Sequence, residues 1–184
     1  IDFLNQIMAE FMQPQTCVTG YNNLNFDDEF IRQALYRNLF EPYAREWQGG
    51  NSRWDVINLM RMAHALRPEG FSWPKKADGT TSFKLEHLAA ANEINHDHAH
   101  DALSDVYATI GVTKKLRQVQ PKLCEFFFKL RLKPFVLDQL YPLKKQMLIH
   151  IATFYPASRA HIGVLLPVAA HPVNRNSIIC VDLL

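Results

Sequence analysis

The chain has 184 residues, enough for one sizeable domain or for one domain and part of another. Its hydrophobic fraction of 48% is ordinary for a folded protein and excludes wholesale disorder. The 20 Lys and Arg residues nearly balance the 18 Asp and Glu residues, so the net charge of +2 excludes a general attraction to polyanions. Any nucleic-acid surface must therefore be a local patch. No apolar run is long enough to span a membrane.

The two ends and the cysteines give expectations about processing and compartment. The N-terminus has neither an initiator Met nor a basic region before an apolar core, so we expect no signal peptide and interpret Ile1 as lying inside a longer chain. The last β-prone run reaches Leu184 without a closing turn, which suggests the same of the C-terminus. Three widely separated cysteines among apolar neighbours indicate buried free thiols in a reducing compartment, the cytoplasm: Cys17, Cys124 and Cys180.

The first half of the chain alternates helical and β-prone patterns. Apolar residues at helical spacing predict a helix over residues 3–12, which Pro14 ends. A short β-prone run at 16–21 predicts a buried strand, and helical spacing returns from Asp27 to Leu39. After a Gly-rich loop at 49–52, the pattern predicts a helix over 54–66.

The second half changes character after Gln120-Pro121, the best candidate boundary. Before it we expect an exposed loop at 71–82 and helices at 85–91 and 101–118. After it come two short helices and then three β-rich runs separated by Pro and Asn turns, at 147–154, 163–170 and 177–183. The sequence thus predicts an α/β chain with one unit at 1–120 and a second at 121–184.

Asp27 closes an Asn-x-x-Phe-Asp motif at a strand-to-helix junction. A structural role is open to it, since an Asp there often caps the helix through its carboxylate. The neighbouring acids Asp28 and Glu29 fit the same account, as first-turn residues that face the helix dipole.

A second motif, His100-x4-Asp105, stands at the start of the long helix. We expect Asp101 to cap this helix, with His100 just outside it and Asp105 in its first turn. Structural roles are open here too, as a loop histidine and another dipole-compensating acid.

Together these residues suit metal-dependent phosphodiester hydrolysis. Two divalent ions about 4 Å apart activate a water and stabilise the attacking and leaving oxygens. Mg²⁺ prefers carboxylate and water ligands, for which Asp27 and Asp105 are candidates. His100 is the candidate general base. Two carboxylates leave the charge of two dications incompletely balanced.

The chain resembles bacterial exodeoxyribonuclease I, a family within the DEDDh (RNase T-like) group of 3′–5′ exonucleases. The resemblance covers essentially the whole chain and rests on the following stretches: Gly20-Tyr21-Asn22-Asn23 with Phe26-Asp27-Asp28-Glu29, Asn51-Ser52-Arg53-Trp54-Asp55, Ala65-Leu66-Arg67-Pro68-Glu69-Gly70, Leu85-Glu86-His87-Leu88, Ala99-His100-Asp101-Ala102 with Asp105-Val106-Tyr107-Ala108-Thr109-Ile110, and His171-Pro172 with Asn174-Arg175-Asn176.

The resemblance implies a partial RNase H-like exonuclease fold at 1–120, the C-terminal part of the exonuclease domain. Linker helices and the first strands of an SH3-like β domain would follow at 121–184. It also implies Asp27 and Asp105 as metal ligands, His100 as general base, and Mg²⁺ (or Mn²⁺) as cofactor. The family's D-x-E motif has no counterpart here, so we expect the chain by itself to be inactive or nearly so.

The resemblance further implies the reaction and the partners. The substrate would be single-stranded DNA with a free 3′ end, degraded to 5′-mononucleotides. The protein partner would be the acidic C-terminal tail of the single-stranded DNA-binding protein. Arg67 is our candidate for gripping that carboxylate, and its alternative role is to cap the carbonyl end of the preceding helix.

Two other interpretations remain open. An HD-type phosphohydrolase would use His64, His100-Asp101 and Asp138, and requires an all-helical domain. A non-catalytic DNA-binding or protein-docking module would bind in a salt-sensitive, Mg²⁺-independent way that Asp105→Asn leaves unchanged.

Overall fold

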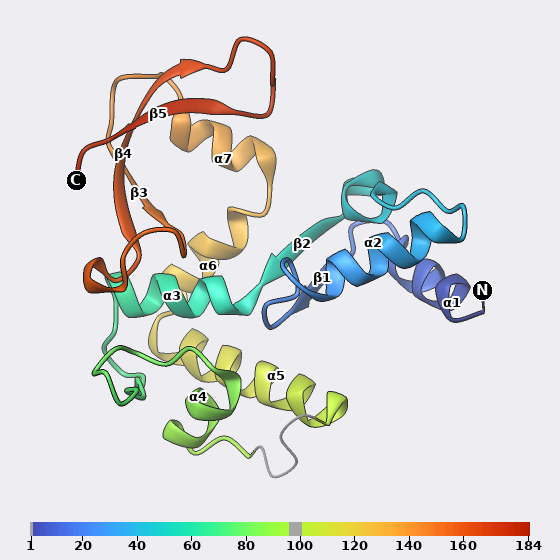
Figure 1. Cartoon of the computed structure of the whole chain (residues 1–184), viewed down its shortest axis with the longest axis horizontal. Helices are drawn as coiled ribbons and strands as arrows, with labels where there is room; N and C mark the ends of the chain where they lie inside the picture. Colours follow the sequence, from blue (N-terminus) through green and yellow to red (C-terminus); the bar gives the residue numbers. More distant parts are fainter. Residues whose placement is uncertain (1, 96–100) are drawn as a thin grey trace.

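The computed structural model describes residues 2–95 and 101–184. It mixes helices with two small sheets (Figure 1). The first part of the chain runs through α1 (Asp2–Phe11), β1 (Cys17–Gly20), α2 (Asp27–Arg37), the 3₁₀ turns η1 (Ala44–Glu46) and η2 (Gln48–Gly50), β2 (Ser52–Asp55) and α3 (Val56–Leu66). The rest comprises α4 (Leu85–Ala91), α5 (Ala102–Val119), α6 (Pro121–Lys129), α7 (Lys133–Leu140), β3 (Leu148–Ile151), η3 (Ala157–Arg159), β4 (Ile162–Ala170) and β5 (Ile178–Asp182).

Strands β1 and β2 form a parallel pair in which Cys17 lies opposite Ser52 and Gly20 opposite Asp55. The sequence predicted a loop to residue 52 and a helix over 54–66, which is wrong at its start, because residues 52–55 are a strand. Trp54 is the buried apolar anchor of this strand, while Asp55 closes it by capping α3 through the N–H of Ile57. Three polar residues in a four-residue strand leave no apolar alternation from which to predict it.

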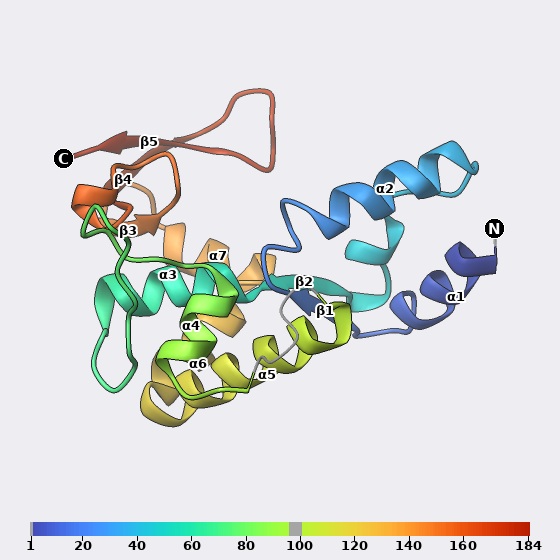
Figure 2. The ribbon, with the colours of Figure 1, turned by 60° about the horizontal axis from the view of Figure 1, so that its bottom comes forward.

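The main core lies where α3, α4, α5 and α6 meet. Its fully buried members are spread over three of these helices, and include Met60, Leu88, Val112 and Leu116. Burying each such side chain contributes roughly 1.5–3 kcal/mol before conformational entropy is subtracted. This core fixes α5, and with it the first turn that carries Asp105. Figures 1 and 2 both show α5 on the side of α3 that faces away from the C-terminal sheet.

The C-terminal part is a three-stranded antiparallel sheet with β4 at its centre. Leu165 pairs with Leu148 on one side and Asp182 on the other. The register shifts between Pro167 and Ala169, where Pro167 has no N–H to donate. Gly163 is required because the Tyr155 ring occupies the space that a Cβ would need. The predicted α/β class, with a β-rich part following a mostly helical part, is confirmed.

The structure also tests the predictions about the cysteines and about membrane-spanning helices. Cys17, Cys124 and Cys180 are free thiols, as predicted, but only Cys124 is buried. Within residues 2–95 and 101–184, no helix combines the length and apolar character that crossing a membrane requires.

Candidate functional site

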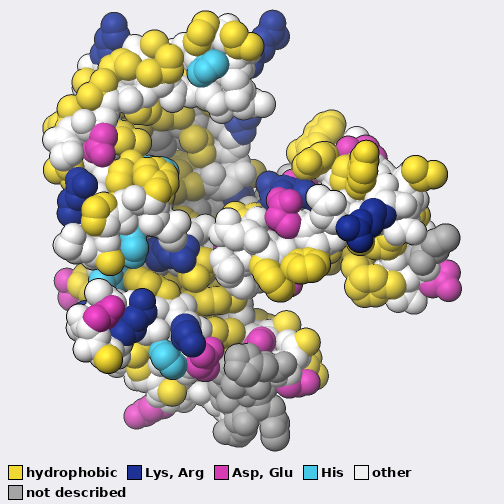
Figure 3. Space-filling view, in the orientation of Figure 1, with side chains coloured by type: hydrophobic (Ala, Val, Ile, Leu, Met, Phe, Trp, Pro, Cys, Tyr) yellow, Lys and Arg dark blue, Asp and Glu magenta, His cyan; other side chains and the backbone are white. Residues whose placement is uncertain are grey.

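A cleft of about 1570 Å³ joins the start of α2 and the first turns of α5 to the loop before α4 and to the turn around η3. It is lined by segments from both the helical part and the C-terminal sheet part. Figure 3 shows the face of the molecule seen in Figure 1, with the C-terminal sheet part above the helical part. The predicted metal ligands Asp27 and Asp105 both line this cleft.

Asp27 is the first residue of α2, and its side chain is exposed. The alternative role of Asp27 as helix cap is wrong. Phe26 occupies the N-cap position of α2, and this cap makes no side-chain hydrogen bond to the helix. The carboxylate is therefore not engaged in capping the helix on which it stands.

Asp105 lies in the first turn of α5 and is half-buried. Asp101 caps that helix, as predicted, by accepting a hydrogen bond from the Ser104 N–H at 3.1 Å. The cap fixes the start of α5, and therefore also the position of Asp105 in the first turn of this helix. The candidate base His100 falls outside the described residues, and its role stays a prediction.

The loop that carries Asp27 is held by Asp55, a residue that the sequence analysis did not single out. The Asp55 carboxylate accepts hydrogen bonds from the backbone N–H groups of Asn22 (2.7 Å) and Leu24 (3.2 Å). It also caps α3 through the Ile57 N–H at 3.1 Å. Burial raises the pKa of this carboxyl, while the three N–H donors and Arg61 act in the opposite direction. An Asp near the start of the helix predicted over 54–66 was the available signal, because Asp often caps a helix.

Asp28 also lines the cleft, but two arginines compensate its charge. Its carboxylate is buried and bonds the guanidinium groups of Arg45 (2.8 Å) and Arg53 (3.1 Å). Arg53 in turn pairs with Glu46 at 3.1 Å. The first-turn dipole role expected for Asp28 is thus incomplete, because these ion pairs hold α2 against η1 and β2.

Asp27 and Asp105 are the right type of ligand for a divalent cation, but two carboxylates are too few for a complete metal site. Carboxylate oxygens are the ligands that Mg²⁺ prefers, and Asp27 and Asp105 supply two such groups to one cleft. Among the described residues, no group of three or more His, Cys, Asp or Glu side chains could hold a metal ion. A closed metal centre therefore needs ligands beyond these two.

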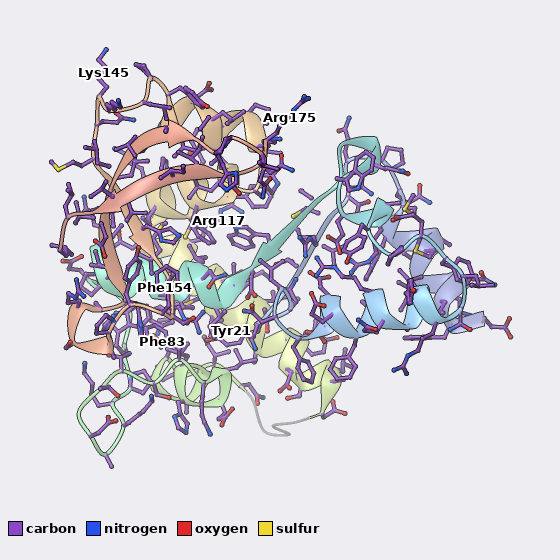
Figure 4. The ribbon with its side chains drawn as sticks, turned by 45° about the horizontal axis from the view of Figure 1, so that its top comes forward. Tyr21, Phe83, Arg117, Lys145, Phe154 and Arg175 are labelled. Carbon is purple, nitrogen blue, oxygen red and sulfur yellow. The ribbon has the colours of Figure 1, made fainter. Side chains whose placement is uncertain are left out.

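Two partly buried aromatic residues, Tyr21 and Phe83, also line the cleft. The Tyr21 hydroxyl donates to the Phe83 carbonyl at 2.5 Å, and burial raises the pKa of Tyr21. Figure 4 shows Tyr21 and Phe83 close to Phe154, which comes from the C-terminal sheet part. Phe154 is 74% exposed. An exposed ring beside the cleft is suited to stacking on bases.

Two family models match the chain. One, described as an exonuclease of the RNase T type, matches residues 4–113, and the other, described as the exonuclease I SH3-like domain, matches residues 131–184. The chain belongs to the exonuclease family.

Curated members of this exonuclease family align along nearly the whole chain. Exodeoxyribonuclease I of Buchnera aphidicola (from Acyrthosiphon pisum) is 47% identical over 186 residues, which cover 99% of this chain and 44% of the relative. Exodeoxyribonuclease I of Escherichia coli is 45% identical over 181 residues, 98% of this chain and 38% of the relative. The chain therefore spans about two fifths of the length of these relatives.

Solved structures of exonuclease I agree with the fold. E. coli exonuclease I in complex with a dA16 oligonucleotide matches with a TM-score of 0.93 at 45% identity, over 99% of this chain and 39% of that one. A complex of exonuclease I with SSB-Ct matches with a TM-score of 0.92 at 44% identity, over the same shares. An exonuclease I from Methylocaldum szegediense matches with a TM-score of 0.91 at 47% identity, over 99% and 38%.

The HD-type interpretation is wrong for this exonuclease-family chain. It required an all-helical domain, whereas the described residues include five strands. Two of its candidate residues also make other interactions: Asp101 caps α5, and the His64 ring lies 2.8 Å from Thr81 Oγ1.

Arg67, the predicted partner-binding residue, lies at the end of α3. Its Nη1 donates to the Leu66 carbonyl at 2.6 Å, which is the capping role considered as the alternative. Its side chain is exposed and also lines a second pocket of about 530 Å³. The other lining residues are Leu66, Gln120, Pro121, Lys122, Leu123, Phe126 and Ile149.

Proposed function

We propose that the protein to which this sequence belongs is a Mg²⁺-dependent 3′–5′ exonuclease that degrades single-stranded DNA to 5′-mononucleotides. The carrying observation is that Asp27 and Asp105, far apart in sequence and held on separate helices, line one cleft. Membership of the exonuclease family gives the reaction class. Mn²⁺ is the expected substitute for Mg²⁺, since both accept carboxylate ligands.

The side chains have separate tasks in this proposal. Asp27 and Asp105 bind the cation and fix its position, while Asp55 holds the loop that presents Asp27. His100 takes the proton from the attacking water. The bound cation supplies Lewis-acid activation of the water and neutralises charge on the phosphodiester. Tyr21, Phe83 and Phe154 offer surfaces for the bases.

The proposal is tested in a chimera, because the chain covers only part of its relatives. The 181 aligned residues of E. coli exodeoxyribonuclease I are replaced by this chain, and 3′-labelled single-stranded DNA is supplied with Mg²⁺. We expect metal-dependent release of 5′-mononucleotides, lowered by at least roughly 100-fold in Asp27→Asn and in Asp105→Asn. Asp138→Asn, an exposed change on α7, is the matched control.

Two results would contradict the proposal. A folded chimera that binds DNA but releases no nucleotides would favour the non-catalytic module, whose binding is salt-sensitive and indifferent to Asp105→Asn. Undiminished release by Asp27→Asn and Asp105→Asn would remove both residues from the metal site. The 184-residue chain by itself should release few or no nucleotides, because two carboxylates do not preorganise two cations.

We also propose that the pocket beside Arg67 receives the acidic C-terminal tail of the single-stranded DNA-binding protein. Arg67 and Lys122 would pair with the terminal carboxylate, and the apolar floor of Leu66, Leu123 and Phe126 would take the last side chain. A fluorescent tail peptide should bind the chain, and Arg67→Ala should weaken binding roughly tenfold, whereas Arg131→Ala should not. Equal binding of a C-terminally amidated peptide would exclude carboxylate recognition.

A further inference from the structure

Three side chains that are cationic, or become so on protonation, line the cleft, and the proposed chemistry does not use them. His64 comes from α3, Lys75 from the loop before α4, and His161 from the turn after η3. The helical part therefore provides two of them and the C-terminal sheet part the third. Once the two histidines are protonated, all three side chains carry like charges, which are unfavourable together without an anion.

Thr81 holds His64 and Lys75 together. The Lys75 ammonium donates to Thr81 Oγ1 at 2.9 Å, and His64 Nε2 lies 2.8 Å from the same oxygen. The rings of Trp73 and Phe83 stand edge-on to the His64 ring, with centroid separations of 5.1 and 5.4 Å. These contacts fix the imidazole and the ammonium before any ligand arrives.

His161 is fixed from the opposite part of the molecule. Its Nδ1 lies 2.9 Å from the Tyr155 carbonyl oxygen, which can only accept, so Nδ1 carries the proton. Nε2 is left to accept from the cleft when the ring is neutral, and becomes a second donor when the ring is protonated.

The charges of these side chains are not neutralised by nearby acids. In the part of the chain that the structure describes, no carboxylate is ion-paired with Lys75 or with either histidine. Two further acids that line the cleft have other partners: Glu86 pairs with Lys84 at 3.5 Å, and Asp78 accepts from the Thr80 hydroxyl at 2.6 Å. Burial, and then the charges of Lys75 and His161, lower the pKa of His64. Arg61, one turn earlier on α3, adds another positive charge to the same wall.

We propose that His64, Lys75 and His161 form a phosphate-binding subsite, shared by the two parts of the molecule, that grips the backbone of a single DNA strand and tightens as pH falls. The placement of the strand, with its 3′ end at Asp27 and Asp105, rests on the proposed function. A phosphodiester would supply the anion that this cluster lacks. Protonation of the histidines adds both charge and N–H donors, so strand binding and proton uptake favour each other.

The test measures binding without hydrolysis. Fluorescence anisotropy of a labelled oligothymidylate is followed with the full 184-residue chain in EDTA, at about pH 7.5 and about pH 5.5. We expect the affinity of the unmodified chain to rise roughly threefold or more at the lower pH, and the slope of log affinity against log salt to steepen. Lys75→Gln should weaken binding at both pH values and reduce the slope by about 0.7, the value for one contact to a single strand.

The histidine variants isolate the pH effect. His161 has a positive φ of 61°, which Asn tolerates, so His161→Asn combined with His64→Gln is the variant of choice. It should bind with nearly the same affinity at both pH values. Thermal melting shows whether each variant is folded, and Lys75→Gln, an exposed change, tests the subsite independently of the aromatic packing. Lys145, which Figure 4 shows at the far end of the sheet part, supplies the control Lys145→Gln.

The outcomes separate this inference from the proposed function. Absence of binding, equal losses in Lys75→Gln and Lys145→Gln, or an unchanged pH effect in the double variant would overturn the subsite. If the binding results hold and the chimera is inactive, the subsite stands and the exonuclease proposal fails. If the chimera is active and the variants bind normally, the reverse is true.

Discussion

The carboxylate of Asp55 accepts a hydrogen bond from the backbone N–H of Asn22, 2.7 Å away, and so ties the end of β2 to the loop that precedes Asp27. Two further N–H groups, from Leu24 and Ile57, converge on the same carboxylate. One buried side chain thus fixes the position of a proposed metal ligand on another element.

Asp55→Asn should destabilise the chain by about 1–3 kcal/mol, because an amide nitrogen would face N–H donors that lose their acceptor. Urea unfolding at neutral pH measures the change. Asp138→Asn, on the exposed surface of α7, is the matched control and should leave the free energy of unfolding unchanged. Equal stability of Asp55→Asn and the unmodified chain would show that the anchoring is dispensable.

Arg45→Met should cost about 3 kcal/mol, at the low end for breaking a buried ion pair, because Arg53 continues to pair with Asp28. Arg45 is only 1% exposed, and its Nε and Nη1 have no hydrogen-bond partner among the described residues. The desolvation of these groups therefore offsets part of the stabilisation from the Arg45–Asp28 ion pair. Lys129→Met, which breaks the exposed pair with Glu125, should change stability little. Chemical denaturation of both variants gives the comparison, and similar losses would contradict the account.

The stability of the chain should fall as pH drops below about 6.5, in part through His64. Burial lowers the pKa of His64 in the folded state. As pH falls, the unfolded chain therefore binds a proton at a higher pH than the folded chain does, and acidification stabilises the unfolded state relative to the folded one. His150, whose pKa burial also lowers, acts in the same direction. Melting temperatures recorded between about pH 7.5 and about pH 5.5 should decline less steeply in His64→Gln. An identical decline in that variant would show that His64 does not contribute.

Gly70→Ala should destabilise more than Gly79→Ala. Both glycines have a φ of 80°, which costs a residue with a side chain about 1–2 kcal/mol. A Cβ at Gly70 would also lie 2.9 Å from Val119 Cβ, whereas nothing lies within 4 Å of the corresponding position at Gly79. The difference between the two free energies of unfolding therefore isolates the close packing of Gly70 on α5. Equal losses would mean that Val119 moves aside freely.

The sequence carried the strongest local signals but not the long-range ones. The cap at Asp101 and the helices around it follow from residue types and spacing, and the structure confirms them. Strand β2 was missed, because four residues with Arg53 and Asp55 among them show no alternation. Ion pairs such as Asp28–Arg45 join separate elements, so they cannot be predicted from a local sequence pattern.

The most direct test of the central claim is paramagnetic broadening of backbone amide NMR signals by Mn²⁺, which asks whether Asp27 and Asp105 share one cation. Titration of the labelled chain should broaden the amides around Asp27 and around Asp105 in parallel, at the same ion concentrations. In Asp27→Asn the broadening around Asp105 should weaken together with that around residue 27. Broadening at one position alone, or at Asp105 unchanged in Asp27→Asn, would contradict a shared site.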